Sequence, residues 1–176
     1  MTESEELQGL ALAIENEEKG YNFYRQAQER VSNSLAKSVF AALAAEEFDH
    51  IEIIKGFHSA LEEKGEWASL DQTQEAKPVA GRVKTVFEKA ATEMEKRVKV
   101  EATDSEAYKA AMELENEAVS LYSGLLQRAT EPNAKQLYKF MVQLETEHWN
   151  LLADTLLYLD NPTGWFFAHE LPLLEG

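Results

Sequence analysis

The chain contains no cysteine among its 176 residues. This absence excludes disulfides, thiolate-bound zinc, iron–sulfur clusters and a rubredoxin-type iron site built from these residues. It also agrees with a reducing compartment, because disulfides form and persist in oxidising ones. We therefore expect a cytoplasmic protein.

Proline and glycine are scarce, with four and eight residues respectively, and several of them fall between helical stretches. Their scarcity predicts long, uninterrupted helices. Long apolar runs are missing as well, since none approaches the roughly 20 residues of a membrane span. The acidic start of the chain, residues 1–6, lacks the basic-then-apolar layout of a signal peptide. We expect no membrane association.

Positive charge is also in short supply, because 17 Lys and Arg residues stand against 32 Asp and Glu residues, for a formal net charge of −15. A surface of this sign repels phosphate, which argues against nucleic acid as a partner. The length suits one domain with a sizeable core.

Hydrophobic residues recur at helical spacing over four long segments, about residues 4–31, 34–64, 106–130 and 134–159. Residues 32–34 should cap the second helix, Gly65 should end it, and residues 103–105 should cap the third. A further amphipathic segment over 82–101 predicts an extra helix within a long crossover. We assign residues 1–160 to one helical domain and expect the apolar tail, residues 161–176, to dock on it or on a partner subunit.

The most informative feature is a set of residues that recurs at a constant spacing of 98 residues. Four carboxylates and two imidazoles suit a pair of metal ions such as iron or manganese. One Glu from each of two helices, with Glu-x-x-His from each of the others, is also the inward-facing di-metal pattern of four-helix bundles. The repeated residues are Glu17, Tyr24, Glu47 and His50 in the first half, and Glu115, Tyr122, Glu145 and His148 in the second.

Helical faces separate these carboxylates from the many others in the chain. Glu17 falls in the apolar stripe between Ile14 and Tyr21, whereas Glu15, although repeated as Glu113, falls on the polar face. Glu17 and Glu47 each lie about 15 residues from the turn between their helices, which places both roughly 22 Å from that turn along the bundle. Carboxylates at one level of an apolar core need neutralisation, and metal ions provide it.

These segments resemble the rubrerythrin branch of the ferritin-like superfamily over about residues 4–160. The resemblance implies an all-α, ferritin-like four-helix bundle with a long crossover between its second and third helices. It further implies a di-iron centre that reacts with peroxide or dioxygen. Rubrerythrins carry one more ligand Glu where this chain has Ala118, and the equivalent position on the first helix is Gly20. The implied metal ligands are Glu17, Glu47, His50, Glu115, Glu145 and His148.

The leading functional hypothesis is a non-haem di-iron oxidoreductase that reduces hydrogen peroxide or dioxygen, with manganese or a mixed metal pair as alternative cofactors. Its electron donor would be separate, a rubredoxin-like protein or a small molecule, and the family suggests a homodimer. A ferroxidase or iron-storage protein is the second hypothesis, and a metal-free structural bundle is the third. Tyr24 and Tyr122 either assist the site, by hydrogen bonding or electron transfer, or are ordinary core tyrosines. His58 and His169 are expected to have a surface or core-edge role, and Trp67, Trp149 and Trp165 are expected to be packing anchors.

Overall fold

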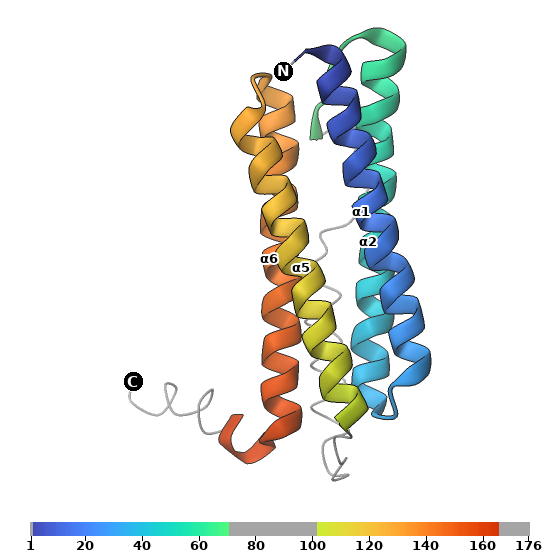
Figure 1. The fold of residues 1–176 in the computed structure, drawn as a ribbon, viewed down its shortest axis with the longest axis vertical. Helices are drawn as coiled ribbons and strands as arrows, with labels where there is room; N and C mark the ends of the chain where they lie inside the picture. Colours follow the sequence, from blue (N-terminus) through green and yellow to red (C-terminus); the bar gives the residue numbers. More distant parts are fainter. Residues whose placement is uncertain (1, 71–101, 166–176) are drawn as a thin grey trace.

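Four long helices make up the computed structural model over the residues it describes, 2–70 and 102–165. They form two antiparallel hairpins that stand side by side (Figure 1). The second and third of them run in the same direction, so the second ends and the third begins at opposite ends of the bundle. The predicted all-α fold is confirmed, whereas the extra helix over 82–101 and the tail beyond residue 165 lie outside the described residues. The helices are α1 (Glu3–Arg30), α2 (Ser34–Lys64), α5 (Ala102–Arg128) and α6 (Pro132–Asp160).

The helix ends follow the capping signals of the sequence with one exception. Asn33 caps α2, because its side chain accepts hydrogen bonds from the backbone of Leu35 at 2.8 Å and of Ala36 at 3.2 Å. Gly65 ends the same helix in the left-handed conformation, with φ of 66°. Asn161 closes α6, as the sequence predicted for residues 161–164.

The exception is the cap predicted at residues 103–105, which is wrong because α5 already begins at Ala102. Asp104 therefore lies inside the helix, where it is fully buried. Its carboxylate accepts hydrogen bonds from the backbone nitrogen of Ser32 at 3.0 Å and from the Ser32 hydroxyl at 3.2 Å. The acidic side chain thus ties the α1–α2 turn to α5 instead of capping its own helix.

Two apolar clusters fill the bundle, one on each side of a polar layer. The first includes Leu10 and Phe57, and the second includes Tyr24 and Phe40. Glu17 lies between Leu10 and Tyr24 along α1, so the polar layer separates the two clusters. Each large apolar side chain buried in them contributes about 1.5–3 kcal/mol. None of the described helices is both long enough and apolar enough to cross a membrane.

Trp67 closes one end of the bundle, just after α2. Its indole nitrogen donates to Glu6 of α1 at 3.1 Å, and its backbone carbonyl accepts from Asn133 of α6 at 3.2 Å. The indole ring packs against Phe57 and Tyr138, each with its centroid 6.0 Å away. These contacts join three helices, in agreement with the structural role expected from the sequence.

Candidate metal centre

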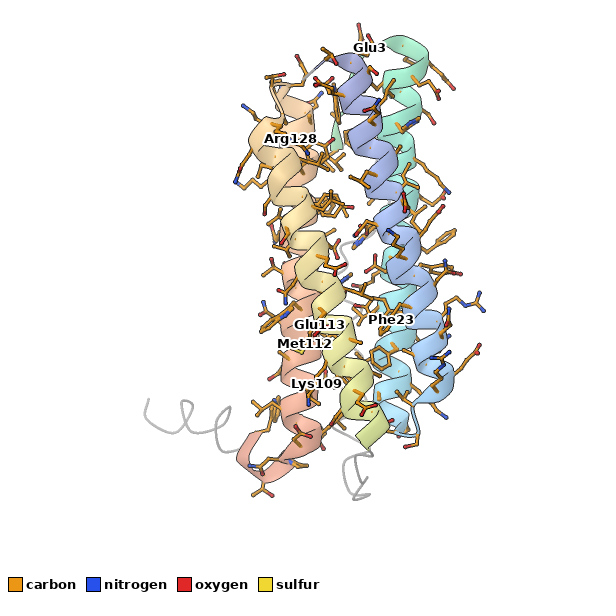
Figure 2. The ribbon with its side chains drawn as sticks, viewed as in Figure 1. Glu3, Phe23, Lys109, Met112, Glu113 and Arg128 are labelled. Atoms are coloured by element: carbon orange, nitrogen blue, oxygen red, sulfur yellow. The ribbon has the colours of Figure 1, made fainter. Side chains whose placement is uncertain are left out.

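The structure brings all six predicted ligands together in the polar layer, with one or two residues from each helix. None of the six is more than 3% exposed. The competing pair, Glu15 and Glu113, is exposed, and Figure 2 labels Glu113 on α5. The buried set consists of Glu17 on α1, Glu47 and His50 on α2, Glu115 on α5, and Glu145 and His148 on α6.

One half of the centre forms around His50, and we call it the His50 position. The Nδ1 atom of His50 lies 3.0 Å from Oε2 of Glu17, 3.3 Å from Oε1 of Glu145 and 3.7 Å from Oε2 of Glu47. Three helices therefore supply this position: α1, α2 and α6.

The other half, the His148 position, repeats this arrangement. The Nδ1 atom of His148 lies 3.2 Å from Oε1 of Glu47, 3.4 Å from Oε2 of Glu145 and 3.5 Å from Oε1 of Glu115. Glu47 and Glu145 thus offer one oxygen to each position, which is the geometry of a bridging carboxylate. The two imidazole rings stack at 5.2 Å with an interplanar angle of 13°.

The donor atoms fit a pair of metal ions. Within each position, one ligand atom from every residue lies within 4.8 Å of the others. The buried Nδ1 of His148 and Oε1 of Glu145 make no hydrogen bond within the described part of the chain. Buried polar atoms without partners are costly, and coordination of an ion would satisfy them. A mixed set of carboxylate oxygens and imidazole nitrogens suits iron or manganese.

Burial governs the protonation of the two unshared carboxylates. It raises the pKa of Glu17 well above the usual range, and the nearby Glu145 and Glu47 raise it further. Burial likewise raises the pKa of Glu115 to about 8, although His148 acts in the opposite direction. When no metal is bound, both shifts favour the protonated form of these carboxyls.

The shared carboxylates and the histidines form the charged part of the centre. Burial opposes the charge of both imidazoles, but Glu145 beside His50 and Glu115 beside His148 outweigh it and raise both histidine pKa values. Burial also opposes ionisation of Glu47 and Glu145, yet the adjacent imidazoles lower both carboxyl pKa values. Without metal, the two imidazoles and the two shared carboxylates therefore favour each other's charged forms.

The repeated tyrosines form crossed hydrogen bonds between the hairpins. The Tyr24 hydroxyl on α1 donates to Oε1 of Glu115 on α5. The Tyr122 hydroxyl on α5 donates in turn to Oε1 of Glu17 on α1. Both tyrosines are fully buried. Each unshared carboxylate is therefore held by the hairpin to which it does not belong.

Glu46 is a buried acidic residue at the centre that the sequence analysis missed. It is fully buried, and its Oε2 lies 2.9 Å from Nε2 of His148. Helical spacing could have identified it, because Glu46 continues the stripe from Leu43 to His50. It has no counterpart in the repeat, since Leu144 occupies the matching place in α6.

A small cavity reaches the centre between α1 and α5. The space in which the centre of a water-sized molecule can move is about 10 Å³, which is room for about one water molecule. Gly20 forms part of its wall, and a Cβ at this position would lie 3.2 Å from the carboxyl carbon of Glu47. The cavity is lined by Asn16, Gly20, Glu47, Leu114, Glu115, Ala118 and Glu145.

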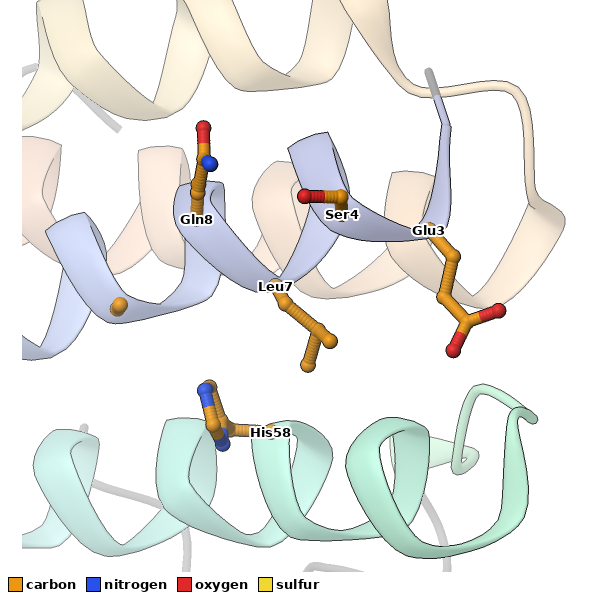
Figure 3. Close-up of a pocket in the computed structure, with 6 residues that line it drawn as sticks. Glu3, Ser4, Leu7, Gln8 and His58 are labelled. Atoms are coloured by element: carbon orange, nitrogen blue, oxygen red, sulfur yellow. The ribbon is translucent and has the colours of Figure 1, made fainter.

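A surface hollow between α1 and α2 is separate from the centre (Figure 3). His58 lines it opposite Leu7, and Nδ1 of His58 lies 3.7 Å from Oε2 of Glu62. The expected surface role of His58 agrees with this position. His169 lies outside the described residues.

Comparison with known proteins identifies one family. The family model described as Rubrerythrin matches residues 8–156, a range that includes all six predicted ligands. No curated protein and no solved structure matches the chain.

Proposed function

Because the chain belongs to the rubrerythrin family, we propose that it is a di-iron oxidoreductase that reduces hydrogen peroxide or dioxygen. The observation that carries this proposal is the pair of metal positions that share Glu47 and Glu145. A cavity of molecular size next to both shared carboxylates adds a place for a small oxidant.

The proposal gives each buried side chain a role as ligand. Glu17 and His50 would bind one ion, Glu115 and His148 the other, and the shared carboxylates would bridge them. Two bound iron ions would supply electrons for cleavage of the O–O bond. Manganese or a mixed pair would use the same ligand set.

The side chains around the ligands would control protons and water. Reduction of hydrogen peroxide to two water molecules consumes two electrons and two protons. The hydroxyls of Tyr24 and Tyr122 each donate a hydrogen bond to an unshared carboxylate and would hold it in place, and the apolar clusters on both sides limit access of bulk water. Gly20 and Ala118 leave open the side on which a small molecule can approach.

Three further parts of the proposal concern the surroundings of the protein. The electrons that restore the ferrous state would come from a rubredoxin-like protein or a small molecule. The protein would act in the cytoplasm as a homodimer. Light scattering of the purified protein measures the oligomeric state directly.

The decisive experiment is rapid mixing of the anaerobic, ferrous protein with hydrogen peroxide, followed optically. We expect oxidation to be faster than that of free ferrous iron at the same concentration. E115Q removes an unshared carboxylate and should slow the reaction at least about tenfold. E113Q changes an exposed carboxylate two residues away on the same helix and should leave the rate unchanged. A rate equal to that of free iron would contradict the proposal.

The same preparation separates the two other functions that the sequence allows. Oxygen-dependent uptake of many irons per chain, with a large hollow assembly, would identify an iron-storage protein. Absence of bound iron, manganese or other metal after reconstitution would identify a structural bundle. About two irons per chain, with turnover of peroxide, is the result we expect.

A further inference from the structure

The two histidines of the centre differ in what lies behind their rings. Nε2 of His148 has the Glu46 carboxylate at 2.9 Å. Nε2 of His50 is buried and makes no hydrogen bond among the described residues. The residue that matches Glu46 in the repeat is Leu144, which belongs to an apolar cluster. The resemblance between the two halves therefore ends immediately behind the predicted ligands.

A carboxylate behind an imidazole changes the imidazole as a ligand. When Nε2–H donates to Glu46, the lone pair of His148 is confined to Nδ1, the atom that faces the His148 position. The negative charge also makes the imidazole more basic and holds the ring in place. His50 receives neither effect, since no acidic side chain occupies the matching position.

Glu46 is suited to orient a ligand and does not itself belong to either position. Its carboxylate faces Nε2 of His148, whereas the other carboxylates of the His148 position face Nδ1. The imidazole ring therefore separates Glu46 from the place where an ion would be bound. Any effect of Glu46 on that ion must act through His148.

We propose that Glu46 is a positioning residue that makes the two metal positions unequal. The His148 position binds its ion more tightly and fills first, and the His50 position fills second and exchanges its ion more readily. This inference rests on the proposed function only in requiring that both positions bind metal. It does not depend on which oxidant the protein reduces.

Titration of the metal-free protein with Mn²⁺ alone tests the inequality. Calorimetry should resolve two steps that differ by roughly 10- to 100-fold in affinity. At one equivalent of Mn²⁺, electron paramagnetic resonance should show an isolated ion, and at two equivalents it should show a coupled pair. Two steps of equal affinity in the natural protein would overturn the inference.

Variants of Glu46 test whether this residue causes the difference in affinity between the two metal positions. E46L copies the residue found at Leu144, and should weaken the tighter step by roughly 10- to 100-fold while leaving the weaker one unchanged. E46Q can still accept the hydrogen bond without the charge, so it should restore part of the lost affinity. E147Q, which changes an exposed residue on α6, should bind as the natural protein does. Unchanged binding by E46L would also overturn the inference.

The double variant E46L/L144E moves the carboxylate to the other half of the repeat. It should regain two unequal steps, because the acidic side chain then lies at the place that matches Glu46 behind His50. Thermal melting checks that each variant folds. If the double variant does not fold, E46Q and E46L alone test whether Glu46 makes the two positions unequal. Complete absence of Mn²⁺ binding by the natural protein would contradict the proposed function instead.

Discussion

The two hairpins of the bundle carry the same chemistry at their centre and different residues around it. Both present Glu, Tyr, Glu and His in matched order. In the α1–α2 hairpin, the residue just before Glu-x-x-His is Glu46, which contacts His148. In the α5–α6 hairpin, the matching residue is Leu144, which lies in an apolar cluster. The residues that would touch metal are repeated, whereas Glu46, which lies behind one of them, is not.

This difference indicates which residues can change near one metal position without loss of the other position. The six repeated side chains constrain one another, because Glu47 and Glu145 each face both positions. Glu46 contacts a single histidine, and Gly20 lies against a single carboxylate. Variants that change what the two hairpins share should therefore have larger effects than variants that change what distinguishes them.

Removal of both shared carboxylates should have the largest effect. The double variant E47A/E145A removes two carboxylate oxygens from each metal position, so we expect metal binding to weaken by at least about 100-fold. Elemental analysis after reconstitution and desalting measures the loss. The matched double variant E15A/E113A removes a repeated but exposed pair and should retain its metal. Equal metal content in the two variants would show that the ions bind elsewhere.

The stability gained from metal should increase with pH. Burial raises the pKa of Glu115 to about 8, from about 4.5, so the metal-free folded protein binds more protons than the unfolded chain between these values. Its stability should therefore fall as pH rises from about 4.5 to about 8. The raised histidine pKa values act in the same direction above about 6.5.

Bound metal replaces these protons, so the loaded protein should not show the same decline. The difference in Tm between Mn²⁺-loaded and metal-free protein, measured at intervals from about pH 5 to about pH 8, should widen with pH. E115Q should reduce the slope of the metal-free protein, because its amide takes up no proton. Parallel pH profiles with and without metal would contradict this account.

The crossed tyrosines should have smaller effects that are similar to each other. Y24F and Y122F each remove a hydroxyl that donates to a buried carboxyl, at a cost of about 1–2 kcal/mol and a fall in Tm of roughly 2–8 °C. Y138F is the control, because its buried hydroxyl makes no hydrogen bond among the described residues, and its Tm should barely change. A large difference in Tm between Y24F and Y122F would show that the two hairpins stabilise the centre differently, although they carry the same ligand residues.

The smallest effect should come from Gly20. G124A changes a glycine in α5 with no atom within 4 Å of the added Cβ, and should stabilise the helix by about 0.5–1 kcal/mol. G20A gains the same helix propensity, but its Cβ would lie 3.2 Å from the Glu47 carboxyl carbon. We expect a smaller rise in Tm than for G124A, together with weaker Mn²⁺ binding. Equal rises with unchanged binding would show that Glu47 moves aside freely.

Helical spacing was sufficient to predict the bundle and to choose Glu17 over Glu15, because burial on a helix follows directly from periodicity. It could not show that Tyr24 donates a hydrogen bond to the opposite hairpin. Helical spacing gives the face of the helix on which a residue lies, but not its hydrogen-bond partner. The cap predicted near Asp104 was wrong for a related reason, because the partner of that carboxylate is Ser32 in a distant turn. The ligand roles themselves stay predictions.

The sharing of Glu47 and Glu145 has a consequence for assembly. The His50 position takes Glu145 from α6, and the His148 position takes Glu47 from α2. Neither hairpin alone contains a complete set, so an ion at either position would need both hairpins in place. Bound metal would then stabilise the packing of the two hairpins against each other, because ions that bind only the folded state stabilise it.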